Sequence, residues 1–150
     1  MRDYSKIHSS FWTSDDIRGM SEDARILALY VLTCPHSNMI GCFRLPDAYV
    51  CDDLQWSSAR TAKAMSELSA RGFATHCQRS KWIIIHRYMK WNQVENPNQG
   101  KAAARLFDQI PDGDIKSLCA MAMDQCAANI VRAVYEHHIP SDETLSKPFR

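Results

Sequence analysis

The chain has 150 residues, 45% of them apolar, and a formal net charge of +1. This composition suffices for one core with a smaller helical appendage, and the nearly neutral total argues against a strongly basic nucleic-acid-binding protein. No apolar stretch approaches the roughly 20 residues of a membrane helix and no signal-peptide segment opens the chain, so we expect a cytoplasmic protein without membrane contact.

The first third of the chain predicts a core helix and a short strand. In "SEDARILALYVLT", Ser21 is placed to cap a helix whose apolar residues recur at helical spacing. The helix should end near Cys34, because the residue before Pro35 is disfavoured in the α conformation. Turn residues then lead into the apolar run 40–45, which predicts a strand.

Two helices should follow in quick succession. "PDAYVCDDL" predicts a short helix with Pro46 at its first position, and the next stretch predicts a longer helix with Ser57 as its N-cap. Gly72 lies where a left-handed residue commonly ends a helix. The residues expected on the buried side of the longer helix are Ala62, Met65, Leu68 and Ser69.

After this helix the sequence pattern changes to that of strands. "FATHC" and "KWIIIHRYMKW" are rich in β-branched and aromatic residues, and the polar "QRS" between them predicts a hairpin with Arg79 and Lys81 at or beside its tip. Helix, strand, short helix, longer helix and hairpin is the order of a winged helix-turn-helix domain.

The predicted fold class is therefore mainly α with a small antiparallel β-hairpin (α+β). We expect a winged helix-turn-helix domain over residues 1–95, a helical C-terminal extension over 96–138 and a flexible tail over 139–150.

The extension should contain a short helix near 100–108 and then one long helix or two. The apolar side of the latter comprises Ile115, Leu118, Cys119, Ala122, Met123, Cys126, Ile130 and Val134. This face either closes the core or binds a partner helix. For the second alternative we expect a homodimer through the C-terminal helix, over Leu118 to Val134, or through the segment at Phe11 and Trp12.

Charge is segregated along the chain. Residues 55–90 contain seven basic side chains and one acidic side chain, a local excess of +6, whereas residues 91–150 contain six basic and eight acidic ones. The basic part coincides with the longer helix and the hairpin, as expected of a surface that faces a polyanion.

The polar side of the longer helix carries short or basic residues, which suit entry into a DNA groove. Arg60 is the candidate for bidentate contact with guanine, and Ser57 and Ser58 are candidates for phosphate contacts. Arg79 and Lys81 would reach the DNA backbone or the minor groove. An ordinary solvated face and a protein-docking surface are the alternatives. The candidate DNA-binding residues are Ser57, Ser58, Arg60, Thr61, Lys63, Arg79 and Lys81.

Motifs for metal binding and catalysis are missing from the sequence. The six cysteines include no C-x-x-C pair, and nothing completes a ligand set around Cys34 and His36 in "CPHS". There is no G-x-S-x-G, no glycine-rich phosphate loop and no Ser/His/Asp spacing. We expect free thiols, no metal, no cofactor and no enzymatic activity.

Several segments within about residues 1–111 are informative when taken together: "MRDYSKI" with "FWT", "ALYVLTCPHSNMIGCFRLPDAYV", the helix end "ARGF" and "WIIIHRYMKWNQVENPNQGKAAARLFDQIP". They resemble the N-terminal region of phage and prophage replication proteins of the replisome-organiser or DnaT-like winged-helix type. The resemblance implies a winged helix that binds phage DNA, often at an origin, and a C-terminal part that engages the host helicase or its loader.

Three hypotheses for the function follow. The first is a double-stranded DNA-binding protein of phage origin that serves replication initiation. The second is a transcriptional regulator with the same DNA-binding module. The third is a protein-docking or inhibitor module that does not bind DNA, which the modest net charge favours.

Overall fold

A computed structural model describes residues 2–141 of the chain. Its α-helices are α1 (Asp15–Arg18), α2 (Glu22–Thr33), α3 (Asp47–Leu54), α4 (Ser58–Ala70), α5 (Tyr88–Trp91), α6 (Pro97–Asp108) and α7 (Asp114–Cys126). Its strands are β1 (Cys42–Arg44), β2 (Ala74–His76) and β3 (Trp82–Ile85). Short 3-10 turns cover Ser9–Thr13, Arg132–Val134 and Glu136–His138. The expected flexible tail lies outside the described residues from position 142 onward.

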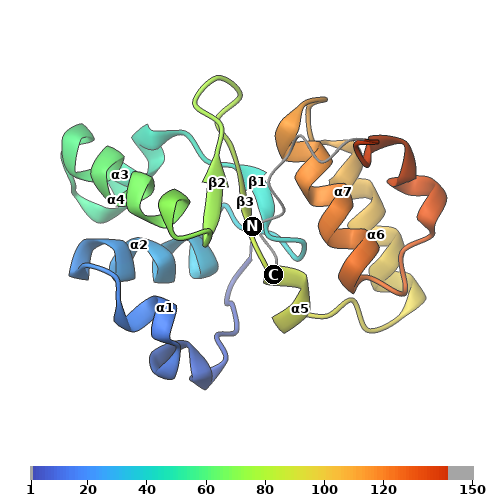
Figure 1. The fold of residues 1–150 in the computed structure, drawn as a ribbon, viewed down its shortest axis with the longest axis horizontal. Helices are drawn as coiled ribbons and strands as arrows, with labels where there is room; N and C mark the ends of the chain where they lie inside the picture. Colours follow the sequence, from blue (N-terminus) through green and yellow to red (C-terminus); the bar gives the residue numbers. More distant parts are fainter. Residues whose placement is uncertain (1, 142–150) are drawn as a thin grey trace.

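The molecule is an α+β protein, as the sequence predicts. A three-stranded antiparallel sheet in the order β1-β3-β2 lies between a group of helices formed by α2, α3 and α4 and a second group formed by α6 and α7 (Figure 1). None of the helices within residues 2–141 has both the length and the apolar character that crossing a membrane requires.

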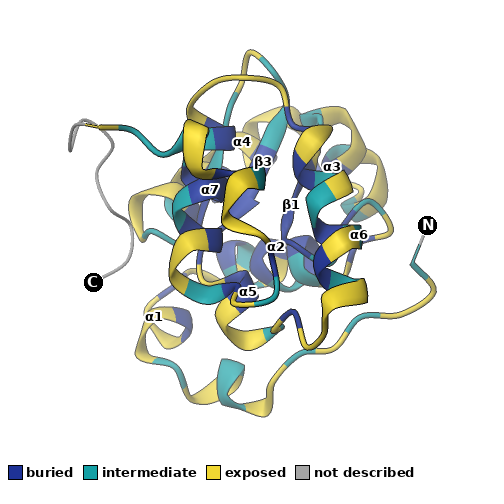
Figure 2. Ribbon diagram, turned by 90° about the vertical axis from the view of Figure 1, so that its right-hand side faces the viewer, coloured by how far each residue is buried: buried dark blue, intermediate teal, exposed yellow. Residues whose placement is uncertain are grey.

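Both faces of the sheet are buried, which explains the uninterrupted apolar run of β3. Ile83 and Ile85 belong to the core beneath α2, α3 and α4, whereas Ile84 belongs to the core beneath α6 and α7. Successive side chains of a strand point to opposite faces, so a strand covered on both sides needs apolar residues at every position. Figure 2 shows the buried residues gathered on the inner sides of the helices and along the strands.

The predicted hairpin of β2 and β3 is confirmed, and β1 joins it as a third strand. The expected second strand over 81–91 is wrong beyond Ile85, because Tyr88–Trp91 form the helix α5. Cys42 and Phe43 of β1 pair with Ile84 and Ile83 of β3. β1 is shorter than the apolar run 40–45 from which it was predicted. A single sequence run indicates a strand but not its partner, so this pairing was not among our expectations.

The expected caps of the main helices are confirmed. The backbone N–H of Ala24 donates to Ser21 Oγ at the start of α2, and that of Arg60 donates to Ser57 Oγ at the start of α4. Gly72 follows α4 with a φ of +70°, the left-handed conformation that glycine adopts without strain. Pro46, expected as the first residue of α3, is instead its N-cap.

The C-terminal part departs from the prediction of one long helix or two. α7 ends at Cys126, Ile130 lies in the turn that follows it, and Val134 lies in the 3-10 turn Arg132–Val134. The Asn129 side-chain amide donates to the Val94 carbonyl oxygen at 2.6 Å, which fixes this segment against the chain that precedes α6.

The apolar face of α7 packs inside the molecule. Leu118, Cys119, Ala122 and Met123 are buried in the core shared with α6 and the sheet. Of the two alternatives for this face, closure of the core is therefore the correct one. Cys126 and Val134 of the expected apolar side are only partly buried, and the homodimer over Leu118 to Val134 stays a prediction.

Candidate nucleic-acid interface

α4 presents a side of small residues to the exterior. Its apolar side packs on α2 and α3 through Thr61, Ala64, Met65 and Leu68. The expected buried face is therefore wrong at Ala62 and Ser69, which are exposed. Helical periodicity places residues 61, 64, 65 and 68 on one stripe of the helix. Threonine is tolerated at position 61 of this buried stripe because its hydroxyl group has a polar contact. The exposed side comprises Ser58, Ala59, Arg60, Ala62, Lys63, Ser66, Ser69 and Ala70.

Thr61 is fully buried, so its expected role in DNA contact is wrong. Its Oγ1 lies 3.2 Å from Cys51 Sγ of α3, which satisfies the hydroxyl inside the helix pair. A buried hydroxyl without a partner would be costly, and this contact makes threonine acceptable in the core. Thr61 holds α4 on α3 and does not face the exterior.

Arg60 is paired within the protein. Its Nε and Nη2 donate to Asp23 Oδ2 and Oδ1 at 2.9 and 2.8 Å, and its guanidinium lies 4.5 Å from the ring centroid of Trp56. The hydrogen bond from Arg60 lowers the pKa of Asp23 and, reciprocally, raises that of Arg60. The two donors expected to read guanine are thus bound to the first turn of α2.

The C-terminal half of α4 is held to the N-terminal end of α2 by a second set of contacts. The backbone N–H of Ser21 donates to Glu67 Oε2 at 2.8 Å, and this bond lowers the pKa of Glu67. Arg71 lies 3.8 Å from the same carboxylate and donates to the Gly19 carbonyl oxygen. The local charge excess is therefore partly neutralised, because two of its arginines serve intramolecular contacts.

The remaining basic candidates are at the surface. Lys63 on α4 and Arg79 in the hairpin turn are exposed, and Lys81 is half-buried. Within residues 2–141, none of these three forms a salt bridge. Ser57 and Ser58 are exposed at the N-terminal end of α4, where the helix dipole favours anions.

The turn of the hairpin is tightly fixed. The backbone N–H of Cys77 donates to the Trp82 carbonyl oxygen, and that of Lys81 donates to the Cys77 carbonyl oxygen, both at 2.8 Å. The Lys81 carbonyl oxygen accepts the N–H of Leu45 at 2.7 Å, which ties the turn to the end of β1. The exposed Arg79 therefore belongs to a well-supported turn, and this turn between β2 and β3 extends beyond the helices in Figure 1.

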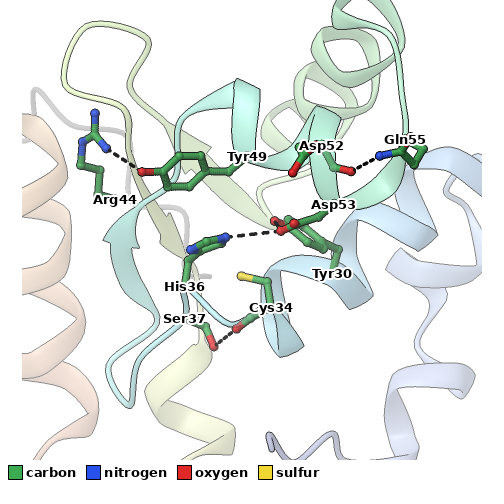
Figure 3. A network of polar contacts seen from close by, with 9 residues as sticks. All are labelled: Tyr30, Cys34, His36, Ser37, Arg44, Tyr49, Asp52, Asp53 and Gln55. Carbon is green, nitrogen blue, oxygen red and sulfur yellow. Dashed lines mark hydrogen bonds and ion pairs between the residues drawn. The ribbon is translucent and has the colours of Figure 1, made fainter. Parts of the chain in front are cut away.

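A polar network beside the helix pair fixes α3, and sequence reasoning missed it (Figure 3). The Tyr30 hydroxyl of α2 donates to Asp53 Oδ2 of α3 at 2.5 Å, and His36 Nε2 lies 3.3 Å from the same oxygen. Burial, followed by the bond to Asp53, raises the pKa of Tyr30. The His36 ring also lies 4.7 Å from that of Tyr49, which lets the network position the first helix of the pair.

This network contains side chains of the kinds that bind metal or act in catalysis. Cys34 is buried, and burial raises the pKa of its thiol, which disfavours the nucleophilic thiolate. Over the described part of the chain, no three His, Cys, Asp or Glu side chains come together as metal ligands do. All six cysteines are free thiols.

Four kinds of feature in this part of the molecule are compatible with contact to a polyanion. They are the capped N-terminal end of α4, its small exposed side chains, Lys63 and the basic hairpin turn. Comparisons of the chain with family models, with curated proteins and with solved structures find no match.

Proposed function

We propose that the chain binds double-stranded DNA as a winged helix-turn-helix protein. In this proposal α4 enters the major groove and the hairpin of β2 and β3 contacts the backbone or the minor groove. The observation that carries it is the small exposed side of α4, with Lys63, next to a rigid hairpin turn that carries Arg79 and Lys81.

Groove geometry supports this assignment. The major groove of B-DNA admits an α-helix, and short outward side chains let the helix approach the base edges. Ala59, Ala62 and Ser66 leave the outer side of α4 unobstructed. Ser57 and Ser58 are placed for phosphate contacts at the helix start. Lys63, Arg79 and Lys81 would then contact phosphates. Arg60 would contribute only if its hydrogen bonds to Asp23 were broken.

We further propose replication initiation in a phage or prophage as the process that this binding serves, with the host helicase or its loader as the protein partner. The resemblance of residues 1–111 to phage replication proteins supports this choice. Transcriptional regulation would use the same surface, and the position of the bound site relative to promoters and origins distinguishes the two.

The experiment is a titration of duplex DNA at several salt concentrations. Affinity should fall steeply with salt, because neutralised phosphates release counterions. Arg79→Ala and Lys81→Ala should each weaken binding to all sequences and reduce the slope of log K against log salt by about 1. Lys101→Ala, an exposed residue of α6, is the matched control and should change neither. Unchanged binding in the hairpin variants would contradict the proposal.

A protein-docking function remains the second candidate, and one observation favours it. Asp52 and Asp53 lie exposed in the last turn of α3, which packs on α4, and Arg60 is already paired. These carboxylates would repel phosphates approaching from that side. Recovery of a stable host-protein complex, together with no salt-sensitive binding to any duplex, would replace the first candidate with this one.

A further inference from the structure

A cavity of about 210 Å³ lies between the N-terminal segment, residues 2–14, and α5. Arg2 anchors this segment, because its Nη1 donates to the Tyr88 hydroxyl at 3.0 Å. Farther along, the His8 ring lies 5.3 Å from that of Trp91. The segment thus forms the outer wall of the cavity, and the core beneath α2, α3 and α4 forms its inner wall.

The inner wall is apolar and aromatic. The side chains that line it belong to this core or pack against it, and they are Phe11, Ile17, Phe73, Ile85 and Tyr88. Trp91, at the edge of the cavity, is 56% exposed, which is unusual for so large an apolar ring. An aromatic ligand would gain ring contacts here and cover apolar surface that the protein leaves open to water.

The charged residues of the lining do not favour an ionic ligand. Arg71 lies 3.8 Å from the Glu67 carboxylate, and Arg87 is likewise engaged within the protein. The lining also contains Lys6 and Asp16, which are exposed and carry opposite charges. A ligand would therefore meet no excess of charge that is left over for it.

The inner wall itself disfavours charge. His86 belongs to it, is buried, and bonds through Nε2 to Thr75 Oγ1 at 2.7 Å. Burial, followed by the charge of Arg87, lowers the pKa of His86 to about 4, so the imidazole carries no charge near neutral pH. An ionised ligand transferred from water to this wall would lose hydration free energy, whereas an uncharged ligand avoids this cost.

The volume of the cavity limits the size of the ligand. An apolar cavity of about 150 Å³ binds benzene, and drug-sized pockets begin at roughly 300 Å³. A volume of about 210 Å³ therefore suits one aromatic ring or two fused rings. Ser14 and Asn92 of the lining supply a hydroxyl and an amide group for a single hydrogen-bonding substituent on the ligand.

We propose that this cavity binds a small uncharged aromatic molecule of one ring or two fused rings, with at most one hydrogen-bonding substituent. Its ring would lie between the Trp91 ring and the apolar inner wall. This inference is independent of the proposed DNA binding, because the cavity includes neither the exposed side of α4 nor the hairpin turn.

The test titrates the full chain with small ligands and follows the methyl signals of Ile17 and Ile85 by NMR, because both side chains are buried in the inner wall. Indole and benzyl alcohol are the uncharged aromatic probes. Benzoate and benzylammonium match benzyl alcohol in size but carry a charge. We expect both uncharged probes to shift the two methyl signals, with a Kd for indole of about 1 mM or tighter. The two charged ligands should bind at least about tenfold more weakly than benzyl alcohol.

Two tryptophan variants make the test specific. Trp91→Ala should weaken the binding of indole about tenfold, because the ring contact at the edge of the cavity is lost. Trp12→Ala is the matched control, since Trp12 is 58% exposed but does not line the cavity, and it should bind indole as the wild type does. The proposal is overturned if neither uncharged probe shifts the methyl signals of the wild type, or if a charged ligand binds as tightly as benzyl alcohol. Equal affinity for indole in the wild type and in the folded Trp91→Ala variant would also overturn it.

Discussion

Arg60 illustrates how one neighbouring carboxylate determines what an exposed arginine can contact. Asp23 accepts both of its donors, and the Trp56 ring lies beneath the guanidinium. The sequence shows that a basic residue follows the N-cap of α4. It does not show that the acidic first turn of α2 lies within reach, because that contact joins positions 37 residues apart. Arg79 and Lys81 of the hairpin form no salt bridge within residues 2–141.

Replacing Asp23 should therefore strengthen DNA binding if the proposed function is correct. Asp23→Ala removes a negative charge and releases Arg60 for phosphate or base contact, so we expect higher duplex affinity and a steeper salt dependence. Glu22→Ala is the matched control, because it removes the same charge from the same turn without freeing an arginine. Equal changes in both variants, measured by duplex titration, would show that Arg60 does not take part.

His86 should make the stability of the protein depend on pH. Its pKa is about 4 in the folded protein against an ordinary 6.5, so the unfolded chain binds the proton first as pH falls. The free energy of unfolding should decrease from pH 6.5 to pH 4, by up to about 3 kcal/mol. The measurement is chemical denaturation across this range. The decrease in the free energy of unfolding should be smaller in His86→Gln than in the wild type. In His137→Gln, whose side chain is exposed, it should equal that of the wild type. Identical decreases in the wild type and both variants would contradict the assignment of the pH dependence to His86.

At the scale of elements, local signals were sufficient for most of the helices and for the hairpin. Ser21, Ser57 and Gly72 mark helix ends through bonds to nearby backbone, which a sequence displays directly. The pairing of β1 with β3 and the rotation of the buried face of α4 depend on contacts between distant segments. The bond between Asn129, just beyond α7, and Val94 likewise joins distant segments. Short-range periodicity carries no information about such contacts.

The close approach of α6 to the segment after α7 yields a prediction at this scale. A Cβ at Gly100 would collide with the Asn129 carbonyl oxygen, which is backbone and cannot rotate away. Gly100→Ala should therefore destabilise the protein by about 1–3 kcal/mol, although alanine favours helices. The adjacent exposed position gives the control, and thermal unfolding should show Lys101→Ala close to the wild type. A stabilised Gly100→Ala variant would mean that the two segments do not touch.

In the whole molecule, one sheet separates two hydrophobic cores, and each core packs against one of its faces. Ile83 and Ile85 pack toward α2 and α4, and Cys42 and Ile84 pack toward α6 and α7. The candidate surface consists of α4 and the hairpin turn. The stability of this surface thus depends on α6 and α7, which contribute no residue to it. The sequence indicated a domain followed by an extension. In the sequence, the uninterrupted apolar run of β3 was the feature that indicates a sheet covered on both faces.

A chain truncated after residue 95 should consequently fail to fold as the full chain does. It would expose Cys42, Ile84 and Met89, which α6 and α7 cover. We expect loss of the cooperative thermal transition and binding of a hydrophobic dye, whereas the full chain should unfold in a single transition. A truncated chain that melts cooperatively at the temperature of the full chain would show that the two cores fold independently.

The central claim is that α4 and the hairpin turn face DNA, and amide chemical-shift mapping tests it most directly. The labelled full chain is titrated with a duplex of about 20 base pairs at low salt, where even non-specific binding is measurable. The predicted result is salt-sensitive shifts concentrated at Ser57, Ser58, Lys63, Arg79 and Lys81, with α6 and α7 largely unaffected. No salt-sensitive shifts with any duplex, or shifts confined to α6 and α7, would contradict the claim.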